Sequence, residues 1–116
     1  MRCRYAIRSN FNSMSIQIRE KDIVRGEPRY ADRCPLALAI RRATGRFVWV
    51  SFEYFFFGDT DNLQEWYYKS PKIPMPREAA MFIHRLDSLH IVRPCTLDLP
   101  IRMGLPSALD TYDRDL

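Results

Sequence analysis

The stretch RCPLALAIRRATG, residues 33–45, contains the start, the body and the end of a helix. Pro35 suits the first turn, where its missing N–H would have no partner in any case. Apolar residues then recur at helical spacing, and two arginines fall in the last turn, where the helix dipole favours cations. Gly45 is the residue type that ends a helix. These signals together predict a helix over residues 35–44.

Strand patterns lie on both sides of this helix. SIQIR, residues 15–19, alternates apolar and polar side chains with the period of a half-buried strand. RFVWVSFEYFFF, residues 46–57, is rich in branched and aromatic residues and gives the strongest strand signal in the chain. GDTDN at 58–62 has turn composition, and LQEWYYKS at 63–70 returns as a second strand. The sequence therefore predicts an aromatic hairpin.

The two predicted faces of the 46–57 strand differ in character. One face is apolar throughout and consists of Val48, Val50, Phe52, Tyr54 and Phe56. The other face carries Ser51 and Glu53 between aromatic residues, so its middle is expected to contact water.

The remainder of the chain adds a second helix and a last strand. Prolines 71, 74 and 76 are expected to break any sheet. Over 76–87 the helical stripe is clear and is formed by Ala79, Phe82, Ile83 and Leu86. CTLDL, residues 95–99, alternates as a strand, and Pro94 before it indicates a strand start or an edge position.

The predicted element order is β-α-β-β-α-β. It indicates a small two-layer α+β domain, with two short helices on one face of a mainly antiparallel four-stranded sheet. The same order matches the ferredoxin-like pattern. One such domain, residues 14–101, accounts for most of the 116-residue chain.

Composition narrows the class of protein. The net charge of +4 permits an acidic partner but lacks the dense basic footprint of a dedicated nucleic-acid binder. Three cysteines form neither a disulfide framework nor the close pairs of a zinc site, which favours reduced thiols in the cytoplasm. No apolar run is long enough to cross a bilayer, so no membrane partner is expected.

Two segments carry a resemblance to a family. CPLALAIRRATG and the later MPREAAMFIHRLDSLHIVRPCTLDL resemble small uncharacterised proteins of tailed bacteriophages, which pair a Cys-Pro-x-Ala-x-Ala helix with a Pro-x-x-Ala-x-x-Phe-Ile…Asp helix. Cys95 departs from the pattern, since the family tends to carry an aromatic residue there. The matching positions are Cys34, Pro35, Ala37, Ala39, Pro76, Ala79, Phe82, Ile83, Leu86, Asp87, Val92, Pro94, Leu97 and Leu99.

The resemblance implies a phage origin and supplies no catalytic residues, and the expected location is the host cytoplasm. Such proteins tend to start directly on the first strand, as this chain would from Met14. Residues 1–13 are therefore interpreted as an N-terminal extension that precedes the native start. Residues 102–116 are predicted to be a mobile tail.

Cys34 has the one recognisable setting for chemistry. A helix N-terminus and the neighbouring Arg33 would lower its pKa and favour the thiolate. A catalytic cysteine also needs a histidine base, and no motif places His84 or His90 for that role. The favoured interpretation is a buried or capping cysteine.

Other catalytic arrangements are weaker still. Glu53 and Glu65 would face each other across the predicted hairpin, but two solvent-facing acids are the commoner arrangement. No glycine-rich phosphate loop occurs. We therefore expect no enzyme activity, no cofactor and no metal site.

The aromatic hairpin and the arginines beside it form the predicted binding surface. Exposed aromatics and arginines suit a protein partner or a homodimer. They also suit base stacking in a nucleic-acid or nucleotide binder, which is the alternative. The favoured function is a non-catalytic phage accessory protein that binds a host protein, in the manner of an anti-CRISPR-type inhibitor of host defence. The predicted binding residues are Arg41, Arg42, Arg46, Trp49, Phe55, Trp66 and Tyr68.

Overall fold

The computed structural model describes residues 13–101. The predicted extension, apart from Ser13, and the predicted tail 102–116 lie outside the described residues. The elements are β1 (Met14–Ile18), α2 (Glu20–Arg25), α3 (Pro35–Thr44), β2 (Phe47–Val50), β3 (Tyr54–Gly58), α4 (Leu63–Lys69), β4 (Ile73–Pro74), α5 (Arg77–Asp87) and β5 (Cys95–Leu99).

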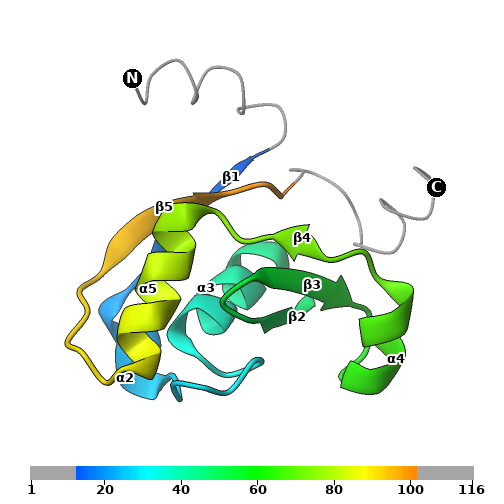
Figure 1. Ribbon diagram of the computed structural model, residues 1–116, viewed down its shortest axis with the longest axis horizontal. Helices are drawn as coiled ribbons and strands as arrows, with labels where there is room; N and C mark the ends of the chain where they lie inside the picture. The colour runs from blue at the N-terminus through cyan, green and yellow to red at the C-terminus, as the bar shows by residue number, and fades with distance from the viewer. Residues whose placement is uncertain (1–12, 102–116) are drawn as a thin grey trace.

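The strands form two antiparallel sheets, which confirms the α+β class and corrects the predicted single four-stranded sheet (Figure 1). One sheet has the order β1-β5 and the other the order β2-β3-β4. The first and last strands, β1 and β5, therefore pair in one small sheet, and the strands between them form the second sheet. The ferredoxin-like order is not observed, because the described residues form four helices and five strands where two helices and four strands were predicted.

The predicted strands at 15–19 and 95–99 are present and pair with each other. Their register places Ile16 opposite Leu97 and Ile18 opposite Cys95. The alternating apolar residues of both strands therefore lie on one face, where Ile16 and Ile18 are fully buried.

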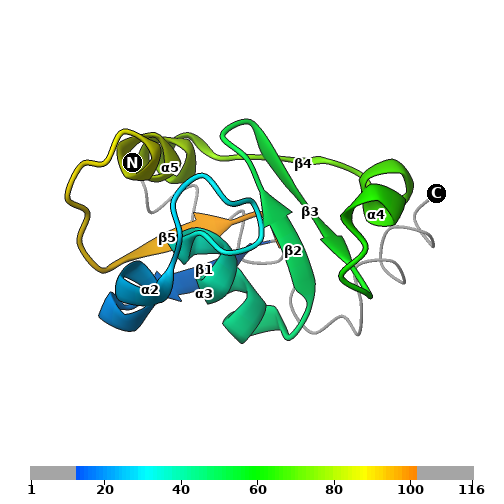
Figure 2. The same ribbon diagram turned by 90° about the horizontal axis from the view of Figure 1, so that it is seen from below.

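Helix α3 begins and ends where the sequence predicts. Cys34 is its N-cap, Pro35 occupies the first turn, and Gly45 ends it in the left-handed conformation with φ of 73°. The helix contacts both β1 and β2, and it lies between the two sheets (Figure 2). Its apolar face thereby joins both sheets to one core.

The single strand predicted over 46–57 is wrong. The chain reverses between β2 and β3, with Val48 opposite Phe57 and Val50 opposite Phe55. The Ser51 hydroxyl donates to the Tyr54 carbonyl at 2.9 Å and accepts from the Tyr54 N–H at 3.1 Å. A serine side chain that satisfies the backbone locally competes with the sheet ladder, and here it forms the turn.

This reversal also corrects the predicted faces. Val48 and Val50 share the main core with Phe55 and Phe57, rather than with Phe52 and Tyr54. The opposite face of the hairpin forms a second, smaller buried cluster of Trp49, Phe56 and Trp66.

The second predicted hairpin strand, 63–70, is helix α4. Asn62 caps this helix by accepting the Glu65 N–H at 3.1 Å, and Lys69 pairs with Glu65 at 2.7 Å one turn away. The Trp66 indole N–H donates to the Thr60 hydroxyl at 2.8 Å. These local bonds favour the helix over the strand that the aromatic composition indicated.

The prolines after α4 do not exclude a sheet, contrary to the prediction. Ile73–Pro74 pairs with β3 as the short edge strand β4, a position where proline is tolerated. Helix α5 then confirms the predicted 76–87 helix, with Pro76 as its N-cap, and the whole predicted apolar stripe is buried. Among the described residues, no helix combines the length and apolar character needed to span a membrane.

Candidate functional site

Most of the aromatic residues predicted to bind a partner are buried. Phe55 is fully buried, and Trp49 and Trp66 are 5% and 4% exposed. Tyr68 alone of the four is a surface residue, at 78% exposed. The sheet surface on which stacking or partner contact was predicted therefore does not exist as an exposed aromatic platform.

Two of the three predicted arginines lie over aromatic rings. The Arg41 guanidinium lies 4.5 Å from the centre of the Phe47 ring, and that of Arg46 lies 5.6 Å from the centre of the Phe57 ring. Cation–π contacts of this kind use the arginine stem to cover apolar surface.

The third, Arg42, has a structural role. Its guanidinium lies 2.5 Å from a carboxylate oxygen of Asp22 and donates to the Gln17 carbonyl at 2.8 Å. Asp22 is 4% exposed and also accepts the Arg19 N–H at 2.8 Å. Burial opposes ionisation of Asp22, but the bonds from Arg42 and Arg19 outweigh it and lower its pKa. Arg42 thus ties α3 to α2 and β1.

Cys34 is the helix cap that the sequence analysis favoured. Its sulfur accepts the Ala37 N–H at 3.4 Å, and the residue is 5% exposed. Burial raises the pKa of the Cys34 thiol to about 11, so the pKa lowering expected from the helix N-terminus and Arg33 is wrong. Arg33 instead lies near Glu27 and Asp32, at 3.8 and 3.6 Å.

The pair of acids considered for general acid–base chemistry is not formed. Glu53 lies in the β2–β3 turn and Glu65 in α4, where it pairs with Lys69. Within residues 13–101, no three histidine, cysteine, aspartate or glutamate side chains gather where they would hold a metal ion.

The surface is hollowed by a groove between α5 and the segment that leads into β5. It has a volume of about 650 Å³, and we call it the α5–β5 groove. Its lining is mainly apolar, with arginines on both walls: Arg77, Glu78, Met81, Phe82, Arg85, Ile91, Val92, Arg93, Pro94, Cys95 and Leu97.

Large apolar side chains are exposed along this groove. Ile91 is 93% exposed, Met81 is 45% exposed, and Leu89, two residues before Ile91, is 75% exposed. Single exposed apolar residues are ordinary, but two in the lining of the groove and a third just before Ile91 form a patch that is typical of interaction sites.

The C-terminal end of α5 shapes one wall of the groove. His90 N–H bonds to the Arg85 carbonyl at 2.9 Å and Leu89 N–H to the Leu86 carbonyl at 3.0 Å, as in a Schellman motif. Leu89 occupies the left-handed position of this motif, with φ of 62°, where glycine is the usual residue. The chain therefore keeps a bulky apolar side chain at a place where backbone sterics disfavour it.

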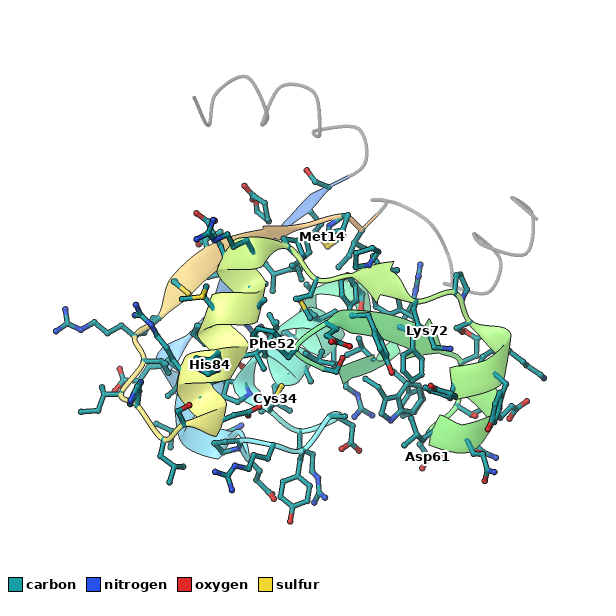
Figure 3. All side chains as sticks on the ribbon, in the orientation of Figure 1. Met14, Cys34, Phe52, Asp61, Lys72 and His84 are labelled. Atoms are coloured by element: carbon teal, nitrogen blue, oxygen red, sulfur yellow. The ribbon has the colours of Figure 1, made fainter. Side chains whose placement is uncertain are left out.

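A second surface aromatic lies beside α5. Phe52, in the β2–β3 turn, is half exposed and packs edge-on against the His84 ring at a centroid distance of 6.1 Å. Figure 3 shows these two side chains meeting between α5 and the β2–β3 sheet, with Cys34 beneath them. This contact links the helix that forms the groove to the second sheet.

None of the residues predicted from the sequence to bind a partner lines the α5–β5 groove. The arginines that line it recur at residues 77, 85 and 93, an eight-residue spacing that continues past the end of α5. Met81 lies outside the buried stripe of α5, and Ile91 follows the helix in a segment with no strand pattern. Neither apolar residue belongs to a predicted buried stripe or strand. Apolar residues outside such patterns are the sequence signal that indicates an interaction surface here.

Comparison with known proteins gives no further guide. No family model, no curated protein and no solved structure matches this chain. A proposal for the function therefore depends on the α5–β5 groove.

Proposed function

We propose that this protein is a non-catalytic module that binds another protein through the α5–β5 groove. The observation that carries the proposal is the apolar groove itself, with Ile91 and Met81 exposed in its lining and Leu89 exposed two residues before Ile91. At about 25 cal/mol per Å² of apolar surface removed from water, a partner that covers these side chains gains several kcal/mol before the cost of association.

A protein partner fits this surface better than a nucleic acid does. Single strands bind by stacking their bases on exposed aromatic faces, and Phe82, the one aromatic residue in the lining of the groove, is buried. The apolar side chains exposed in the groove, Met81 and Ile91, suit the core of a protein interface.

The resemblance to tailed-bacteriophage proteins supports a specific setting. In that setting the partner is a host protein in the host cytoplasm, and the module acts as an accessory that interferes with host defence. This role rests on the two resembling segments, which include α3 and α5.

The test compares two single variants in quantitative affinity purification from bacterial cells. Ile91→Asp places a charge in the groove, and Tyr68→Asp makes the matching change at another exposed site, on α4. Both residues are more than three-quarters exposed, so neither change should unfold the protein. We expect a partner that wild type and Tyr68→Asp retain at 0.5 M salt and that Ile91→Asp loses at least tenfold.

Other outcomes overturn the proposal. A partner lost only by Tyr68→Asp would place binding on α4, and a partner insensitive to both changes would place it elsewhere. Release of bound nucleic acid with a steep salt dependence would favour the nucleic-acid alternative.

A further inference from the structure

We infer that the occupant of the α5–β5 groove is an acidic segment of the partner protein that carries apolar anchor side chains. The inference rests on the proposed function and names the chemistry of the ligand. It depends on two properties of the groove: an apolar floor and arginines on both walls that have no ionic partner among the described residues.

The apolar floor defines what the centre of the ligand must be. Phe82 and Leu97 are buried at its base, and Val92 is half-buried beside them. Met81 on one wall and Ile91 on the other stand exposed above this floor. A leucine, isoleucine or aromatic side chain from a partner would therefore be enclosed from both sides, which is the arrangement of an interface anchor.

The arginines define what must flank the anchor. Arg77 and Arg85 are eight residues apart on α5, which is about 12 Å along the helix axis. Arg93 lies on the opposite wall. None of the three guanidinium groups makes an ion pair or a side-chain hydrogen bond within residues 13–101, whereas Arg33, Arg42 and Lys69 each have a carboxylate within 4.0 Å.

The lining carries one acidic residue against these three cations. Glu78 already takes part in an interaction of its own. The groove thus presents an excess of positive charge around an apolar centre, and carboxylates on the ligand complement it. A second copy of this chain is a poorer occupant, because a symmetric contact would bring two sets of these arginines together.

Leu89 is a second indication that this edge is kept for contact. Glycine would fit its φ of 62° better, yet the chain carries an exposed leucine there. Strained residues of this kind concentrate at functional sites. The same geometry makes Leu89→Gly a useful variant, because it removes the side chain while suiting the backbone.

The experiment is selection from a yeast-displayed library of random dodecapeptides, with the full-length protein as bait at 0.15 M salt. Enriched peptides are synthesised, and their affinities are measured by fluorescence anisotropy. We expect enriched sequences that combine a large apolar residue with two or more aspartates or glutamates, and affinities that fall at least fivefold with Leu89→Gly.

Charge reversal supplies the specific test. Arg93→Glu should weaken a selected acidic peptide at least tenfold, and replacing an acidic residue of that peptide by lysine should restore part of the loss. Arg25→Glu is the matched control, since Arg25 is an exposed arginine on α2, outside the groove. It changes the net charge equally and should have less than a twofold effect.

The outcomes separate this inference from the proposed function. Apolar peptides with no acidic preference, which lose affinity with Ile91→Asp but not with Arg93→Glu, would overturn the inference and leave groove binding intact. Peptides insensitive to both changes would overturn the inference and the groove together. If no peptide is enriched, a short acidic segment is not the ligand, and the affinity purification alone then decides the proposed function.

Discussion

Replacing Arg42 by methionine tests whether this residue stabilises the fold or instead binds a ligand. The change keeps an unbranched side chain and removes the guanidinium that contacts Asp22 and the Gln17 carbonyl. Removing one partner of a buried ion pair costs about 3–5 kcal/mol. The Arg42 side chain is 30% exposed, so water replaces part of the lost interaction. We therefore expect a loss of about 2 kcal/mol in the free energy of unfolding.

Urea denaturation measures this loss. For a domain of this size, with an m-value of about 2 kcal/mol per M, the midpoint should fall by roughly 1 M at pH 7. Arg41→Met is the matched control from the neighbouring position of α3. Its guanidinium lies over Phe47 at the surface, where a cation–π contact contributes about 0.5–1 kcal/mol, so its midpoint shift should be less than half as large.

The pH dependence distinguishes an ion pair from a simple packing effect. The folded state lowers the pKa of Asp22, so the pair stabilises the protein above the unfolded aspartate pKa of about 3.9. That contribution is lost as the pH falls through the lower folded pKa. The gap between wild type and Arg42→Met should therefore shrink in acid. Two results would refute this role for Arg42. One is an equal loss of unfolding free energy in Arg42→Met and Arg41→Met, and the other is a difference between wild type and Arg42→Met that stays constant as the pH falls.

Three further predictions concern the packing of α4 against β3, the cap of α4 and the setting of Cys34. Gly58→Ala would place a methyl group 2.5 Å from the Trp66 ring, so we expect thermal unfolding to show a loss of about 1–3 kcal/mol; an unchanged melting temperature would contradict this packing. Asn62→Ala removes the cap of α4 and should cost about 1 kcal/mol in urea unfolding, whereas a strand at 63–70 would lose nothing from it. Cys34 should react with iodoacetamide near neutral pH far more slowly in the folded protein than in urea, because burial raises its pKa to about 11; rapid labelling of the folded protein would revive a catalytic role.

Elements were predicted correctly where the residues that specify them lie close together in the sequence. Helix α3 needed only its proline, its apolar spacing and its glycine, and all three act within 12 residues. The same holds for the stripe of α5 and for the alternation of β1 and β5. In each case the element buries one regular face, and the period of that face is visible in the sequence.

The predictions for the aromatic region, residues 46–70, were wrong because its composition favours strands, whereas its local hydrogen bonds form a turn and a helix. Trp66 belongs to a residue class that favours strands, yet Asn62 and Glu65 three residues later form a helix-start signal that composition alone obscures. Ser51 reads as a water-facing strand residue, but its hydroxyl forms the turn. A reversal there shifts every following side chain to the other face, which is why the predicted faces were wrong.

The sequence by itself determined the α+β class, the two main helices, the first and last strands and the position of Cys34 at the start of α3. Only the tertiary structure decided which aromatics are buried, because both faces of the β2–β3 hairpin are covered, one by α3 and one by Trp66 of α4. It also formed the α5–β5 groove. The groove joins residues from α5, from the segment that follows it and from β5, and no periodicity records a surface built from three separate segments.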